Sequence, residues 1–161
     1  MDSAMGSQLI KSGLSLPTGI WSAESNLSNP ELVYKIHQEN IAAGASYITA
    51  NTFRTTPRAY MKMGLAQNEA TLKSKESMNS AIRVAKKAAS NKVKVLGSIA
   101  PLEDCYRPDL FPGLEVAVKE SRTLGEELAN GGVDIIILET MNSVIEIESC
   151  LKALQTIEKP I

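Results

Sequence analysis

The sequence predicts an α/β fold with a parallel sheet. Three short apolar segments have the composition of buried strands, and each leads into a polar residue: 47–50, 93–97 and 133–138. A stretch with helical periodicity separates each strand from the next, which is the repeat of a βα unit. At roughly 45 residues from one strand to the next, the eight units of a (β/α)8 or TIM barrel need well over about 300 residues, close to the usual size of such a barrel with insertions. This chain has 161 residues, so the pattern predicts close to half of a barrel.

Composition excludes several classes of function. The 17 basic and 18 acidic residues give a net charge of -1, which offers no electrostatic basis for binding nucleic acid or an anionic membrane surface. No apolar run approaches the ~20 residues of a membrane span. The N-terminus lacks the basic and apolar regions of a signal peptide. We therefore expect a cytoplasmic protein.

The cysteine content excludes two further kinds of site. Cys105 and Cys150 are too few for a disulfide framework. With one histidine and no close spacing, they also make no credible zinc site.

The first clear helix is expected to begin after Ser28 and Asn29, either of which can cap it. Pro30 suits the first helical position, and Gly44 suits a left-handed C-terminal cap before the strand at 47–50. The remaining elements follow in the same way along a single domain, 1–161. They are a helix at 68–90 with Leu72 among its buried positions, a strand at 93–97, an ordered loop at 101–113, a helix at 114–130, a strand at 133–138 and a helix at 144–155.

Candidate site residues lie where the predicted strands end. Ligands of parallel α/β folds bind at the carboxyl ends of the strands, which selects Asn51, Thr52, Ser98 and Glu139. Glu139 follows four apolar residues, and a carboxylate in such a place needs a cationic partner. That partner is either an arginine of the chain, in an internal salt bridge, or the ammonium group of a substrate.

Other polar groups have open interpretations. Asn51 and Thr52 either bind a ligand or cap the turn after their strand. His37 is expected to be half-buried on the surface of its helix, and Trp21 to pack near the pocket entrance or at the bottom of the barrel. No glycine-rich phosphate loop and no nucleophile elbow is present.

A series of short motifs, each present once, follows along the chain in this order: Asp2-Ser3-Ala4-Met5-Gly6-Ser7, Ile20-Trp21-Ser22-Ala23, Pro30-Glu31-Leu32-Val33 with Ile36-His37, Ala43-Gly44-Ala45, Thr49-Ala50-Asn51-Thr52-Phe53, Gly97-Ser98-Ile99-Ala100-Pro101, and Gly132-Val133-Asp134 through Leu138-Glu139-Thr140-Met141. Together they resemble the homocysteine S-methyltransferase family over nearly the whole chain. The first motif resembles that family's opening strand and turn, usually written Asp-Gly-Ala-Met-Gly-Thr.

The resemblance implies a (β/α)8 barrel, of which this chain holds the first four βα units and the first residues of the fifth strand. It implies transfer of a methyl group from a sulfonium-type donor, S-methylmethionine or S-adenosylmethionine, to the thiolate of homocysteine, giving methionine. In the complete enzyme a zinc ion on three cysteine thiolates binds that thiol. Carried to this sequence, Glu139 accepts the homocysteine ammonium, Asp2 and the backbone after it line the pocket, and Asn51 and Thr52 lie beside them.

The sequence departs from the family pattern in two ways. The family's zinc cysteines come from its sixth and eighth strands, and neither Cys105 nor Cys150 matches them. Ser3 and Ala100 stand where glycine is usual, and serine rarely adopts the positive φ that glycine tolerates. We therefore expect the chain alone to be catalytically inactive, with no catalytic or metal-binding residue of its own. We also expect self-association through the open edges of the barrel.

The sequence leaves two alternatives open. One is a naturally short, non-catalytic half-barrel that binds an amino acid or a partner chain. The other is a different (β/α)8 enzyme that shares only the architecture; it predicts that homocysteine does not bind and that Glu139→Gln changes nothing.

Overall fold

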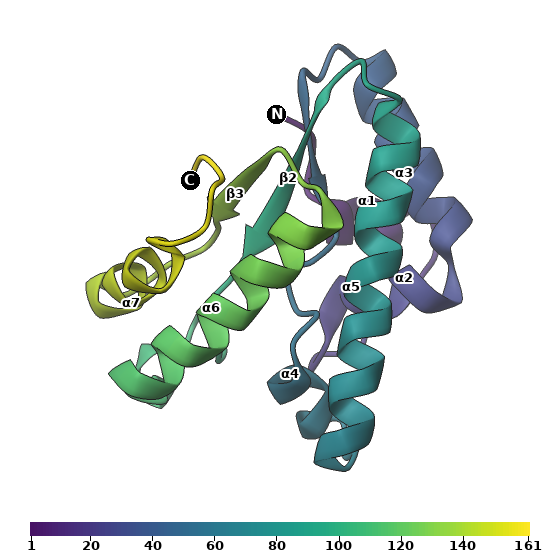
Figure 1. The fold of residues 1–161 in the computed structure, drawn as a ribbon. Coiled ribbons are helices and arrows are strands. Elements are labelled where there is room, and N and C mark those ends of the chain that lie inside the picture. The colour runs from purple at the N-terminus through teal and green to yellow at the C-terminus, as the bar shows by residue number, and fades with distance from the viewer.

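The computed structural model describes all residues 1–161 and has three parallel strands covered by helices (Figure 1). The sheet order is β1-β2-β3, with Tyr47 opposite Lys94 and Leu96 opposite Ile135. The elements, in chain order, are α1 (Met5–Lys11), η1 (Trp21–Glu24), α2 (Ser25–Ser28), α3 (Pro30–Ala42), β1 (Tyr47–Ala50), α4 (Pro57–Lys62), α5 (Gln67–Ala89), β2 (Lys94–Ile99), η2 (Pro108–Leu110), α6 (Leu114–Gly131), β3 (Ile135–Leu138) and α7 (Val144–Leu154).

Local sequence signals account for the ends of several helices. Pro30 opens α3, as its fixed φ and missing N–H allow. Gly44, at φ +94°, follows the end of α3, and Gly132, at φ +82°, follows the end of α6. The side chain of Thr56 caps α4 by accepting the N–H of Ala59 at 3.1 Å.

The main core lies between the sheet and its helices. The strands contribute Ile48, Val95 and Ile136, which are at most 3% exposed, and α5 and α6 contribute Met78 and Leu128. These apolar contacts hold the strand ends in place, because burial of apolar surface is the main favourable contribution to folding. No helix is both long and apolar enough to cross a bilayer.

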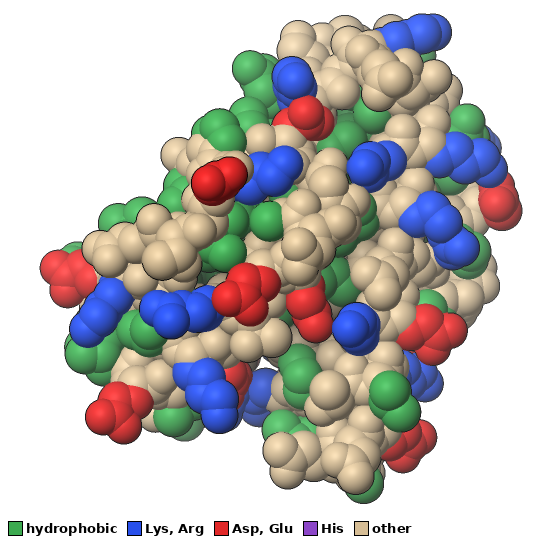
Figure 2. All heavy atoms as spheres, viewed as in Figure 1, with side chains coloured by type: hydrophobic (Ala, Val, Ile, Leu, Met, Phe, Trp, Pro, Cys, Tyr) green, Lys and Arg blue, Asp and Glu red, His purple; other side chains and the backbone are tan.

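The outer surface carries charges of both signs. Figure 2 shows Lys and Arg side chains interspersed with Asp and Glu over the face that carries α5 and α6. A hollow of about 390 Å³ lies between α4, α5 and α6, with Arg58 and Glu120 in its lining.

The expected opening strand at the N-terminus is wrong. Residues 1–4 are irregular, and α1 begins at Met5 with Gln8 donating its N–H to Ala4. The carboxylate of Asp2 accepts the N–H of Thr49 at 2.7 Å. A side chain therefore takes a backbone donor of β1 that a paired strand would have used, and the structure has three strands where four were expected.

Of the other predictions, the positions of the main elements are confirmed, and the burial of two residues is wrong. The three later strands and the four long helices lie where they were predicted, within one or two residues at most ends. Leu72 is 73% exposed although it was expected to be buried. His37 is fully buried, where a half-buried surface position was expected, because α1 and α5 both pack on α3. The short helix α4 was not predicted.

Candidate functional site

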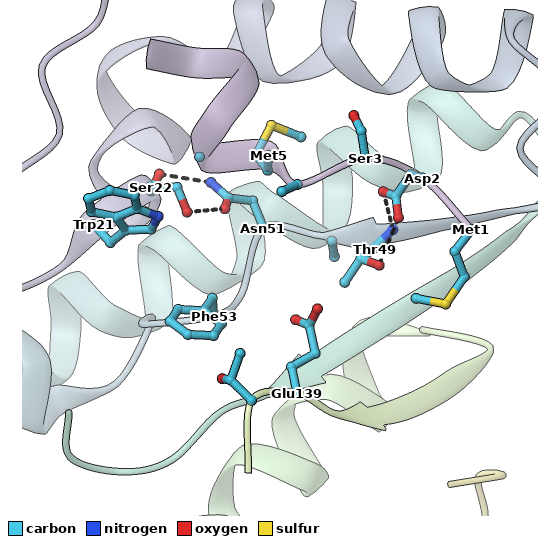
Figure 3. A pocket seen from close by; sticks show the side chains of 14 residues that line it. Met1, Asp2, Ser3, Met5, Trp21, Ser22, Thr49, Asn51, Phe53 and Glu139 are labelled. Carbon is cyan, nitrogen blue, oxygen red and sulfur yellow. Dashed lines mark hydrogen bonds between the residues drawn. The ribbon is translucent and has the colours of Figure 1, made fainter. Parts of the chain in front are cut away.

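A cavity of about 340 Å³ lies at the carboxyl ends of β1 and β3 (Figure 3). The N-terminal segment and the end of β1 form its two long walls, and Glu139 and Thr140 close it from the side of β3. Its lining residues include no lysine, arginine or histidine: Met1, Asp2, Ser3, Ala4, Met5, Gly6, Trp21, Ser22, Thr49, Ala50, Asn51, Phe53, Glu139 and Thr140.

Glu139 points its carboxylate into this cavity (Figure 3). Its backbone N–H donates to the carbonyl of Ile99 at 2.9 Å, so the residue still follows the register of the sheet. The hydroxyl of Ser98 donates to one carboxylate oxygen. None of the seven ion pairs of the chain includes Glu139. The internal salt bridge that was one interpretation of this residue is therefore not formed.

Asp2 lines the opposite wall of the cavity. Both of its carboxylate oxygens bind Thr49, one the N–H at 2.7 Å and the other the hydroxyl at 3.0 Å. Burial raises the pKa of Asp2 above its ordinary value, and the two hydrogen bonds from Thr49 partly oppose that rise. Asp2 therefore fastens the N-terminal segment to β1 and adds a second acidic group to the cavity.

Asn51 lines the cavity, but its side-chain amide is hydrogen-bonded to other residues of the protein. Its Nδ2 donates to the carbonyl of Ser22 at 2.8 Å and to Oδ1 of Asn26 at 2.8 Å, and its Oδ1 accepts the Ser22 hydroxyl at 2.6 Å. Asn26 continues the network by donating to the hydroxyl of Ser77 on α5 at 3.0 Å. Both amide hydrogens of Asn51 are used, so its main contribution is to hold η1, which supplies Trp21 and Ser22 to the cavity, together with α2 against the end of β1.

Thr52 does not line the cavity. Its hydroxyl accepts the N–H of Ser98 at 2.9 Å and donates to the carbonyl of Ser98 at 2.9 Å. Of the four residues predicted to bind substrate, the fold thus brings Asp2, Asn51 and Glu139 to one cavity and leaves Thr52 behind it.

Two aromatic residues line the cavity. Trp21 was expected near the pocket entrance or at the bottom of the barrel, and the structure puts it at the cavity, whereas Phe53 was not predicted as a site residue. Trp21 has a left-handed backbone at φ +49°, and Phe53 follows the end of β1. A Cβ added to Gly6 would meet Cε2 of the Trp21 indole at 3.0 Å, so the glycine lets α1 approach this ring closely. In the sequence, only Gly6 indicated that another group approaches α1 closely. Nothing in the sequence identified that group as Trp21, which lies in a separate segment.

The residues present do not fit a zinc site. No group of three or more His, Cys, Asp or Glu side chains lies close enough to hold a metal ion. Cys150 is buried 3.4 Å from the Ser121 hydroxyl, and burial raises the pKa of its thiol. Cys105 lies in the loop after β2, and neither cysteine lines the cavity.

The chain is similar in sequence to proteins named homocysteine S-methyltransferases. The chain is 30% identical over 169 residues to a homocysteine S-methyltransferase of Escherichia coli (strain K12), and 25% identical over 169 residues to homocysteine S-methyltransferase YbgG of Bacillus subtilis. The alignments cover 96% of this chain and 53% or 54% of those proteins, so the chain spans about half the length of these curated relatives.

Solved structures agree with these relatives. The crystal structure of the homocysteine methyltransferase MmuM from Escherichia coli, in its metallated form, superimposes with a TM-score of 0.85 at 27% identity. The match covers 99% of this chain and 59% of that one. The family model for homocysteine S-methyltransferases matches residues 1–161. The chain belongs to the homocysteine S-methyltransferase family.

Proposed function

We propose that this chain forms the amino-acid-binding half of an enzyme that methylates homocysteine to methionine. The observation that carries the proposal is the carboxylate of Glu139, which faces the cavity and takes part in no ion pair of the chain. Membership of the family and the position of the cavity at the strand ends support the same substrate.

Charge complementarity supports binding of a cationic amino group. An ammonium placed at Glu139 forms charge-assisted hydrogen bonds and supplies the partner that a half-buried carboxylate needs. Asp2 adds a second acidic group on the facing wall, where the amino group of Met1 acts on it, and the lining holds no basic side chain. The faces of Trp21 and Phe53 offer cation–π contacts, which suit a sulfonium donor such as S-methylmethionine or S-adenosylmethionine.

The reaction we propose is a single displacement at the methyl carbon. The thiolate of homocysteine attacks that carbon, a new carbon–sulfur bond forms, and the bond to the donor sulfur breaks with its electron pair. The products are methionine and a neutral thioether. The family resemblance implies zinc at the thiolate in the complete enzyme, but this chain has no fitting ligands, so we assign it substrate binding and no metal chemistry.

We also propose the architecture of the complete protein. The parallel order β1-β2-β3 and the match to 59% of the MmuM chain support a (β/α)8 barrel of which these residues form the first half. A reducing, cytoplasmic setting is consistent with the free thiols of Cys105 and Cys150. The 161-residue chain by itself is then expected to be inactive.

The test is homocysteine binding by calorimetry with Glu139→Gln. We expect affinity to fall at least about tenfold, since the ammonium then meets a neutral amide in place of a carboxylate. The matched control is Glu148→Gln, an exposed position on α7. A second ligand sharpens the test: 4-mercaptobutyrate lacks the amino group, so its affinity should not change in Glu139→Gln. Equal homocysteine affinity in the wild type and in Glu139→Gln would contradict the proposal.

The second candidate is a non-catalytic half-barrel that binds an amino acid, a role that the unpaired carboxylate of Glu139 in the cavity would also serve. The two candidates differ in turnover by the protein as its source cell makes it. Methionine formed from homocysteine and S-methylmethionine supports the enzyme. Homocysteine binding without methyl transfer supports the binding module.

A further inference from the structure

Three neighbouring strand ends are joined by side-chain hydrogen bonds that lead to the cavity. The hydroxyl of Thr52, after β1, binds both the N–H and the carbonyl of Ser98 in β2, each at 2.9 Å. The hydroxyl of Ser98 donates to the carboxylate of Glu139, after β3. Glu139 is the only one of the three that lines the cavity. Thr52 and Ser98 are each 3% exposed and lie behind it.

We propose that Ser98 is a positioning residue that aims the carboxylate of Glu139 at the ligand, and that Thr52 acts through Ser98. The ammonium ligand in this inference rests on the proposed function above. A glutamate side chain has three rotatable bonds, and the chain places no lysine or arginine beside this one to hold it. The Ser98 hydroxyl binds Oε2 and leaves Oε1 free for the ligand.

The role of Thr52 follows from the way β1 ends. The ladder between β1 and β2 pairs Ala50 with Gly97, and no backbone pair of β1 reaches Ser98. Asn51, the next residue, turns its side chain to Ser22 and Asn26. The Thr52 hydroxyl therefore binds the backbone N–H and carbonyl of Ser98, as the backbone of a longer β1 would otherwise do. Because both backbone groups of Ser98 are hydrogen-bonded, the backbone at Ser98 is fixed, and the side chain is held where its hydroxyl can donate to Glu139.

The first test measures the order of the Glu139 side chain in the free protein, by NMR relaxation of its side-chain carbons. Ser98→Ala should lower that order, and Thr52→Val should lower it in the same direction. The matched control is Ser149→Ala, which removes a buried hydroxyl that donates to Ile145 within α7 at 2.6 Å. Unchanged order in Ser98→Ala overturns the inference, and unchanged order in Thr52→Val alone overturns the part assigned to Thr52.

The second test is a double-mutant cycle on homocysteine affinity with Ser98→Ala and Glu139→Gln. Ser98→Ala should weaken binding by up to about tenfold in the wild-type background, because the ligand must then order a Glu139 side chain that is mobile in the free protein. In the Glu139→Gln background it should add little, because its effect passes through the carboxylate. An equal loss in both backgrounds means a general structural role and overturns the inference.

The two proposals fail in different ways. If wild-type protein does not bind homocysteine, or Glu139→Gln binds it equally well, the proposed substrate falls while the relaxation measurement still decides the role of Ser98. If Ser98→Ala does not fold, as judged by circular dichroism, Ser98→Cys replaces it in both tests, since a thiol is of similar size and only a weak donor.

Discussion

The N–H of Ile136 in β3 donates to the carbonyl of Pro160 at 2.9 Å. The last residues of the chain therefore lie along the edge of β3 that β2 does not occupy (Figure 1). This is the position in which a fourth strand of the sheet would pair. One backbone hydrogen bond covers little of that edge, and the neighbouring α7 leaves Val144 71% and Leu151 44% exposed.

We predict that the chain self-associates through this region, because open sheet edges and exposed apolar side chains favour association. Light scattering over a range of concentrations should show species heavier than 17.4 kDa. Val144→Glu with Leu151→Lys should shift the distribution toward monomer. Leu72→Glu, at an equally apolar and exposed position on α5, should not. A wild-type chain that stays monomeric at every concentration would contradict the prediction.

His37 should make the protein less stable in mild acid. It is fully buried, neither ring nitrogen has a hydrogen-bond partner, and burial lowers its pKa from 6.5 to about 4. The unfolded chain therefore takes up a proton first as the pH falls. The stability contributed by the neutral ring is present above about pH 6.5 and is lost progressively down to about pH 4.

The measurement is urea unfolding at pH 7.5 and pH 5. Wild type should lose about 2 kcal/mol more of unfolding free energy than His37→Leu over this interval, as linkage predicts for the pKa shift. His37 is the only histidine of the chain, so no other imidazole contributes. An equal loss in both proteins would show that the folded-state pKa of His37 is close to its ordinary value.

Arg58 should stabilise the fold by joining three segments. Its guanidinium donates to both carboxylate oxygens of Glu120 on α6, at 3.1 and 2.5 Å, and to Glu103 after β2 at 2.9 Å. Arg58→Met should cost about 1–2 kcal/mol, since it leaves a largely buried Glu103 with Lys62 alone. Arg107→Met, which breaks an exposed pair with Asp109, should cause no measurable change in thermal unfolding. Equal effects of the two variants would refute this.

Gly6 should control the position of the cavity wall. A methyl group at this residue would contact the indole of Trp21, so Gly6→Ala should displace the ring and change the emission of the only tryptophan in the chain. Ser7→Ala, at the next and exposed position of α1, should leave the emission unchanged. Homocysteine affinity should fall in the first variant only. Identical spectra for Gly6→Ala and wild type would show that the wall tolerates the added methyl.

Local patterns in the sequence determined the parallel α/β class and the place of Glu139. An apolar run ending in a carboxylate predicts a buried strand with an acidic group at its mouth, and this needs no knowledge of distant residues. Helix limits at Pro30 and Gly44 were predictable for the same reason, because caps depend on neighbours in the chain.

Only the tertiary structure decided how the strand-end residues divide their work. Thr52 and Ser98 are 46 positions apart, and Asn51 and Ser22 are 29 apart, so no local signal pairs them. The same holds for Asp2, whose carboxylate takes the N–H of Thr49 in place of a paired strand, and for His37, which packing of α1 and α5 on α3 buries. The sequence by itself determined which residues reach the ends of the strands. The partners of those residues depend on long-range packing, which sets which hydrogen-bonding groups remain free to meet a ligand.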